Sequence, residues 1–105
     1  MFGDLVWLVA NARPDAGGIE VQSAEALALL DDRLRTAGSD RASLLSVHVL
    51  LADIEHRAVF DRHWDAWIGA DPHGWPQRAC YGASLAPGLL VEIVATAART
   101  GSPRT

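Results

Sequence analysis

The chain has 105 residues with one cysteine; 50% of its residues are apolar and 21% are charged, a balance typical of one globular domain spanning residues 1–105. Nine arginines against 13 acidic residues leave a net charge of −4, and lysine is absent from the sequence. Chemistry that needs a lysine amine, such as Schiff-base catalysis or a P-loop, is therefore excluded. Scattered arginines on an acidic chain also disfavour a nucleic-acid partner, because binding the phosphate backbone needs clustered positive charge.

The lone cysteine, Cys80, has no partner for an internal disulfide, so a reducing compartment is expected. The first four residues lack the basic region of a signal peptide, and the apolar run 5–10 is too short to span a membrane. We therefore expect a cytoplasmic protein that does not bind membranes.

The first half of the chain predicts a strand, a helix and a second strand. Residues 5–10 are apolar and branched, which predicts a strand covered on both faces. Residues 23–37 carry apolar side chains at helical spacing, and Gly38 is placed to end that helix. Residues 44–51 are again apolar and branched and predict a central strand.

The second half predicts a helix and two strands. Asp53 can cap a helix that ends at Gly69 and carries one apolar stripe along its length. The Pro- and Gly-rich residues 70–77 predict an exposed loop. Residues 78–85 and 89–98 predict two strands, and the Ala-Pro-Gly between them suits an antiparallel hairpin.

This order of elements predicts an α+β sandwich, a mixed sheet with two helices on one face, followed by a flexible polar tail at residues 99–105. Eight apolar strand residues exceed what two helices are expected to cover, which predicts burial by a second subunit and hence a homo-oligomer. These eight are Val6, Leu8, Leu45, Val47, Val49, Leu51, Val91 and Ile93.

Few residue patterns point to chemistry. The four histidines show no zinc-motif spacing, so no metal site is expected. His63 is expected to be a half-buried side chain with its hydrogen bonds satisfied, and the same holds for His48 unless it faces a subunit cleft. Cys80 is a possible nucleophile, but a small buried apolar role is favoured for it.

Arg78 and Glu92 are the candidate catalytic pair. Arg78 opens a predicted strand, and Glu92 interrupts the apolar run 89–94, where a carboxylate is costly to bury unless it is paired or lies in a cleft. An antiparallel hairpin would bring the two side chains to one site. The alternative is a structural ion pair or a charge at the sheet edge.

At these residues the sequence resembles a known family. Residues 76–85 (Pro-Gln-Arg-Ala-Cys-Tyr-Gly-Ala-Ser-Leu) and 88–93 (Gly-Leu-Leu-Val-Glu-Ile) resemble the C-terminal signature of the Rid family (RidA/YjgF-like, formerly endoribonuclease L-PSP). Residues 3–6, Gln22 and residues 46–53 resemble its earlier motifs in the same order.

The resemblance implies a chorismate-mutase-like α+β fold and a homotrimer around a central β-barrel, with ligand sites in the clefts between subunits. Family enzymes act without a cofactor and hydrolyse reactive 2-imino acids, the tautomers of enamines, to 2-keto acids and ammonium. The resemblance further implies that Arg78 binds the substrate carboxylate, that Glu92 holds the attacking water, and that the Cys80 backbone contacts the imine nitrogen.

Several positions depart from the family pattern. The N-terminal segment with a substrate-contacting tyrosine has no counterpart, Val9-Ala10-Asn11 stands where Ser-Gly-Gln is common, and Asp61 stands where asparagine is frequent. Asn11 and Trp75 remain candidate substrate contacts, with a loop anchor as the alternative for Trp75.

Two function classes therefore stay open. The first is a 2-imino acid deaminase, such as one acting on 2-iminopropanoate, and the second is a non-catalytic trimer that binds small carboxylates (2-keto acids) as a sensor or metabolic partner. The ribonuclease activity in the older family label fits poorly with the negative net charge.

Overall fold

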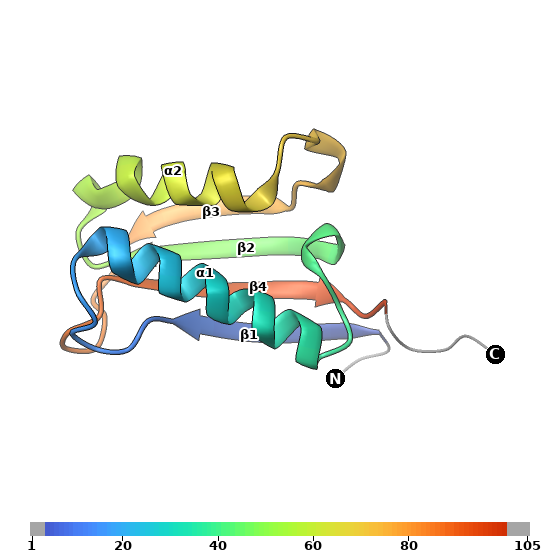
Figure 1. The fold of residues 1–105 in the computed structure, drawn as a ribbon, viewed down its shortest axis with the longest axis horizontal. Helices are drawn as coiled ribbons and strands as arrows, with labels where there is room; N and C mark the ends of the chain where they lie inside the picture. Colours follow the sequence, from blue (N-terminus) through green and yellow to red (C-terminus); the bar gives the residue numbers. More distant parts are fainter. Residues whose placement is uncertain (1–3, 101–105) are drawn as a thin grey trace.

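A computed structural model describes residues 4–100 of the chain, which form an α+β fold (Figure 1). Its strands and helices are, in chain order, β1 (Leu5–Asn11), α1 (Ile19–Thr36), β2 (Leu44–Leu51), α2 (Arg57–Ile68), β3 (Gln77–Gly82) and β4 (Val91–Ala98). Short 3-10 turns at 41–43, 54–56 and 72–74 precede β2, α2 and β3.

The strands of this region form one mixed sheet in the order β1-β4-β2-β3. β4 runs antiparallel to both β1 and β2, whereas β2 and β3 are parallel and are joined through α2. The predicted hairpin between residues 78–85 and 89–98 is therefore wrong. A strand followed by a crossover helix returns as a parallel neighbour, so β3 takes the outer place beside β2 and the last strand inserts between β1 and β2.

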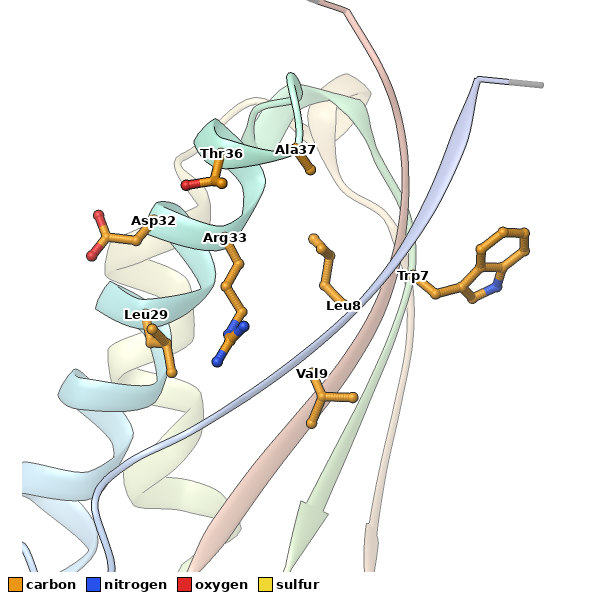
Figure 2. A pocket seen from close by; sticks show the side chains of 8 residues that line it. All are labelled: Trp7, Leu8, Val9, Leu29, Asp32, Arg33, Thr36 and Ala37. Atoms are coloured by element: carbon orange, nitrogen blue, oxygen red, sulfur yellow. The ribbon is translucent and has the colours of Figure 1, made fainter. Parts of the chain in front are cut away.

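Both helices cover the same face of the sheet, as predicted. Along β4 burial alternates residue by residue, and the buried members Val91, Ile93, Ala95 and Ala97 join one core with Leu30 of α1 and Phe60 of α2. Figure 2 shows the same alternation on β1, where Leu8 points toward α1 and Trp7 points away from it. We call the face away from the helices the open face.

The structure corrects the prediction that two helices are too few to cover the apolar strand residues. Five of the eight apolar residues named for it are fully buried against the helices: Val47, Val49, Leu51, Val91 and Ile93. Val6 and Leu8 pack partly on this core as well. Leu45, the eighth of these residues, remains 47% exposed. The open face also exposes apolar side chains outside that group, which include Trp7 (54% exposed), Val9 (48%) and Tyr81 (43%).

β1 is thus an edge strand with one open face, and not a strand covered on both faces as predicted. Its run of apolar side chains suggested two covered faces because sequence alone shows which side chains are apolar and not which neighbours they meet. β1 and β4 pair without interruption from Leu5 opposite Ala98 to Asn11 opposite Glu92.

The helix boundaries follow local signals. α1 begins at Ile19, four residues before the predicted start, and ends before Gly38, whose φ of +81° favours glycine. Asp53 caps the 3-10 turn at 54–56, where its side chain accepts a hydrogen bond from the Glu55 amide at 2.9 Å, and α2 follows at Arg57. Gly69, with φ of +90°, ends α2 as predicted.

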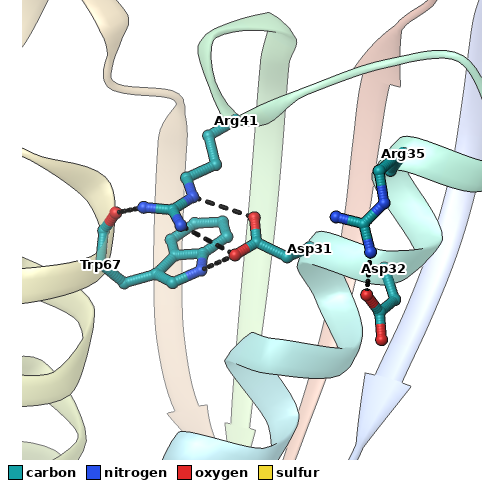
Figure 3. Close-up of polar contacts among 5 residues, drawn as sticks. All are labelled: Asp31, Asp32, Arg35, Arg41 and Trp67. Atoms are coloured by element: carbon teal, nitrogen blue, oxygen red, sulfur yellow. Dashed lines mark hydrogen bonds and ion pairs between the residues drawn. The ribbon is translucent and has the colours of Figure 1, made fainter.

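A polar cluster joins the two helices and the turn before β2 (Figure 3). Arg41 donates through Nε and Nη2 to the Asp31 carboxylate of α1 at 2.9 and 2.8 Å. It also donates to the Trp67 carbonyl of α2, and its guanidinium lies 4.7 Å from the Trp67 ring centroid. The Trp67 indole in turn donates to Asp31 at 3.0 Å.

Within residues 4–100 no helix is long and apolar enough to cross a membrane. Most of the predicted flexible tail, residues 101–105, lies outside the described range. Its first two residues are hydrogen-bonded, since the Arg99 amide donates to the Asp4 carbonyl at 2.6 Å and the Thr100 amide to the Gly38 carbonyl at 2.7 Å.

Candidate functional site

Arg78 lies near the start of β3 with its side chain turned toward α2. Its Nη2 donates to Asp61 Oδ1 at 2.7 Å, and the guanidinium lies 5.3 Å from the ring centroid of Trp64. The Arg78 side chain is 19% exposed. The guanidinium is therefore oriented by Asp61, and its Nη1 is buried without a hydrogen-bond partner in the described part of the chain.

Two hollows meet at Arg78. One, of about 510 Å³, lies where the 72–76 segment passes the start of β2, and Trp75 lines it together with Arg78. The other, of about 190 Å³, includes His48 of β2 and Ala79. Arg78 lines both of them.

Trp75 itself anchors its loop. The indole Nε1 donates to the Gly69 carbonyl at 3.0 Å, and the side chain is 52% exposed. The structure thus supports the loop-anchor interpretation of Trp75, and its position beside the larger hollow leaves a substrate contact as a prediction.

Cys80 lies on the same face of β3 as Arg78, two residues along the strand, and is half-buried. Burial raises the pKa of the Cys80 thiol above its usual value, against a smaller opposing effect from the Arg78 charge. A raised pKa keeps the thiol protonated at neutral pH and so weakens it as a nucleophile, which agrees with the apolar role favoured from the sequence.

Glu92 lies on the opposite side of the sheet. It alternates with the buried Val91 and Ile93, which places it on the open face, between Asn11 of β1 and Leu50 of β2. The predicted contacts Asn11 and Glu92 are thus cross-strand neighbours. The side-chain Nδ2 of Asn11 donates to the Ala12 carbonyl at 2.9 Å.

Arg78 and Glu92 do not meet within one chain. β2 lies between their strands, and the residues of β2 that pair with them, Val47 and Leu50, are three apart. Two strand spacings of about 4.8 Å and three residues of about 3.3 Å place their Cα atoms about 14 Å apart. Because the two side chains also leave opposite faces, a site that uses both requires more than one copy of the chain.

The open face carries a second polar pair that the sequence did not single out together. His48 Nδ1 lies 3.2 Å from the Tyr81 hydroxyl, and the two rings meet edge to face. His48 and Tyr81 belong to parallel strands, and only their pairing register, with His48 opposite Ala79, places them near each other. His63, by contrast, is satisfied as expected, since its Nε2 lies 2.6 Å from Glu20 Oε1.

A further hollow of about 460 Å³ lies between β1 and α1 and is shown in Figure 2. Its lining includes Leu8, Leu29 and Arg33, and none of the predicted site residues. The hollows beside Arg78 are therefore the ones that bear on the candidate site.

Comparison with known proteins decides the family. The model of the family described as endoribonuclease L-PSP matches residues 9–99, which is most of the chain. The chain belongs to the endoribonuclease L-PSP family. The resemblance of residues 76–93 to the RidA/YjgF signature is thereby confirmed.

Curated relatives of this family carry the name RutC family protein. One from Haemophilus influenzae is 38% identical over 74 residues, which are 70% of this chain and 62% of that protein. YoaB from Escherichia coli is 39% identical over 85 residues, which are 80% of this chain and 72% of that protein. The match to the first of these therefore spans less than two thirds of the relative's length.

Solved structures agree with the fold. A member of the YjgF protein family from Neisseria meningitidis has a TM-score of 0.83 at 36% identity, covering 94% of this chain and 82% of that one. An uncharacterized protein from Pseudomonas aeruginosa has a TM-score of 0.84 at 35% identity, covering 95% and 87%. The endoribonuclease L-PSP family member described here shares their α+β architecture.

Proposed function

We propose that this protein hydrolyses reactive 2-imino acids, such as 2-iminopropanoate, to 2-keto acids and ammonium at clefts between the subunits of a homotrimer. The observation that carries the proposal is Arg78, whose side chain is 19% exposed and oriented by Asp61, and which lines two hollows. A planar guanidinium that offers parallel donors is suited to gripping a carboxylate.

The open face supports the trimer. Its exposed apolar side chains, among them Trp7, Val9 and Tyr81, form a surface of the kind that another subunit covers. Glu92 lies on this face and Arg78 on the other. Assembly through the open face would carry Glu92 of one copy toward Arg78 of its neighbour and complete a site that one chain lacks.

The proposed reaction is an addition followed by an elimination. Water adds through its oxygen to the imine carbon, and its proton passes to Glu92, which acts as general base. The same proton then reaches the nitrogen of the tetrahedral adduct. As the C–N bond breaks and the C=O bond forms, the remaining hydroxyl proton passes to the departing nitrogen and gives ammonia, which takes a further proton from the solvent to become ammonium. Throughout, Arg78 holds the carboxylate, and no oxidant or cofactor is consumed.

A non-catalytic carboxylate-binding trimer is the second candidate. The observation that favours it is the separation of Glu92 from Arg78 within the chain, because binding a carboxylate needs only the arginine. A ribonuclease function has less support, since six arginines of the described region already pair with carboxylates of the chain: Arg13, Arg35, Arg41, Arg57, Arg62 and Arg78.

The test generates 2-iminopropanoate in situ and follows pyruvate release above the spontaneous rate. Wild type is expected to accelerate release. Arg78→Ala is expected to lose both pyruvate binding and turnover, since two charge-assisted hydrogen bonds of roughly 1.5–3 kcal/mol each disappear. Glu92→Gln is expected to lower turnover while pyruvate affinity stays near that of wild type.

Each function predicts its own pattern of results. Pyruvate binding without any acceleration across several imino acids contradicts the deaminase and supports the binding module. Full activity in Arg78→Ala removes Arg78 from the site altogether. An Arg33→Ala control, whose guanidinium lies by the distant hollow between β1 and α1, is expected to behave as wild type.

A further inference from the structure

Asp61 contacts Arg78 but has no role in the proposed reaction. It projects from α2, its Oδ1 accepts from Arg78 Nη2 at 2.7 Å, and its Oδ2 lies 3.6 Å from Arg57 Nε. The Asp61 side chain is 32% exposed. One carboxylate is therefore shared between a half-buried arginine and a more exposed one on the same helix.

This sharing sets the charge around the Arg78 guanidinium. Arg57 and Arg78 contribute two positive charges and Asp61 one negative charge, which leaves a net charge of +1. A ligand with one carboxylate neutralises that charge. A ligand with two carboxylates leaves an excess negative charge near Asp61, which lies 2.7 Å from Arg78, and like charges that are partly buried repel each other.

The hydrogen bond has a separate consequence for geometry. Nη2 is engaged by Asp61 and the guanidinium lies over Trp64 at 5.3 Å, so two side chains of α2 fix the orientation of the guanidinium. The carboxylate thus directs the guanidinium as well as lowering the net charge of the site. An asparagine at this position would keep the accepting oxygen and remove the charge.

We propose that Asp61 is a specificity-determining residue that orients Arg78 and restricts the site to ligands with a single carboxylate. This inference rests on the proposed function, because it assumes that Arg78 receives the ligand's carboxylate. It assigns the choice between monocarboxylate and dicarboxylate ligands to one side chain of α2 that makes its own contact with Arg78.

The experiment compares dissociation constants of pyruvate and 2-oxoglutarate by calorimetry for wild type, Asp61→Asn and Asp65→Asn. Wild type is expected to prefer pyruvate. Asp61→Asn is expected to bind 2-oxoglutarate about tenfold more tightly and pyruvate with a smaller gain, because Arg57 and Arg78 then both lack a charged partner. Asp65, an exposed carboxylate on the same helix, is the matched control and should leave both constants unchanged.

Two further measurements separate charge from packing. The change in preference between the two acids that Asp61→Asn causes should be smaller at 0.5 M salt than at 50 mM, since screening weakens a charge effect and leaves a steric one unchanged. Asp61→Glu retains the charge and should keep the wild-type preference. This variant also provides the test if Asp61→Asn fails to fold.

The possible failures are distinguishable. If wild type binds neither acid, the proposed function fails and this inference fails with it. If wild type binds pyruvate but Asp61→Asn shifts both acids equally, or Asp65→Asn shifts the preference as much, only the role of Asp61 is overturned.

Discussion

Gln22 is a buried polar residue that holds the loop before β4 against α1. It is 1% exposed, and its amide donates to the carbonyls of Gly17 and Gly88 at 3.2 and 2.9 Å. Its Oε1 accepts from the Leu90 amide at 2.9 Å. One side chain therefore satisfies three backbone groups at the point where the chain turns toward Glu92.

Replacement of Gln22 by methionine, of similar length, should destabilise the protein by about 2–3 kcal/mol, because buried backbone groups lose their partners. The measurement is urea unfolding at a fixed protein concentration, since assembly shifts apparent stability. Gln77→Met, at an exposed position of β3, should stay within about 0.5 kcal/mol of wild type. Equal stability of the two variants would contradict the role given to Gln22.

Residue types alone singled out Arg78 and Glu92 as unusual, and the structure gives each a distinct environment. The apolar run around Glu92 predicted that a carboxylate there needs an explanation, and its place on the open face supplies a physical one. The partnership of Arg78 with Asp61 could not be predicted, because it depends on α2 crossing over β3. The spacing of residues within one helix or strand does not show which residues of the two elements come into contact.

The elements are joined by polar contacts as well as by the apolar core. Arg41, in the turn before β2, contacts Asp31 of α1 and Trp67 of α2 at once (Figure 3). Arg35 and Asp32, the residue after Asp31, form an ion pair within α1 alone, with side chains 74% and 63% exposed. The two ion pairs therefore form a matched comparison between a contact among elements and a contact within one.

Arg41→Ala should destabilise the protein by about 1–2 kcal/mol, a value reduced for the partial exposure of the pair, since a stacking contact and several hydrogen bonds are lost together. Arg35→Ala should cost less than about 0.5 kcal/mol, as is usual for an exposed ion pair. Thermal and urea unfolding of both variants measure the difference. A larger loss for Arg35→Ala than for Arg41→Ala would contradict this account of how the helices are joined.

At the level of elements, the sequence predicted the two helices and the positions of the strands, because these follow from periodicity, glycine stops and an aspartate cap. The order of strands in the sheet was not predicted correctly. The Ala-Pro-Gly after residue 85 resembles a hairpin turn, yet β3 already pairs with β2 and β4 fills the place between β1 and β2. The prediction paired β3 with β4 because they are close in the sequence, whereas the βαβ crossover pairs β3 with β2.

The whole molecule presents one face covered by helices and one open face, and the two halves of the proposed site lie on different faces. Arg78, Cys80 and Trp75 gather near β3, while Glu92 and Asn11 lie beside each other across β1 and β4. The proposed trimer brings these halves together, so its activity should belong to the assembly and not to the single chain. Light scattering is expected to give about three times the monomer mass.

The most direct test of a site shared between subunits is complementation between two inactive variants. Arg78→Ala and Glu92→Gln are refolded together from denaturant, and pyruvate release from 2-iminopropanoate is compared with each variant refolded alone. Random assortment places an intact arginine and an intact glutamate from different subunits at about a quarter of the sites, so about a quarter of the wild-type activity should return. If the mixture forms mixed trimers and remains as inactive as its components, Arg78 and Glu92 do not act across a subunit boundary and the shared site is contradicted.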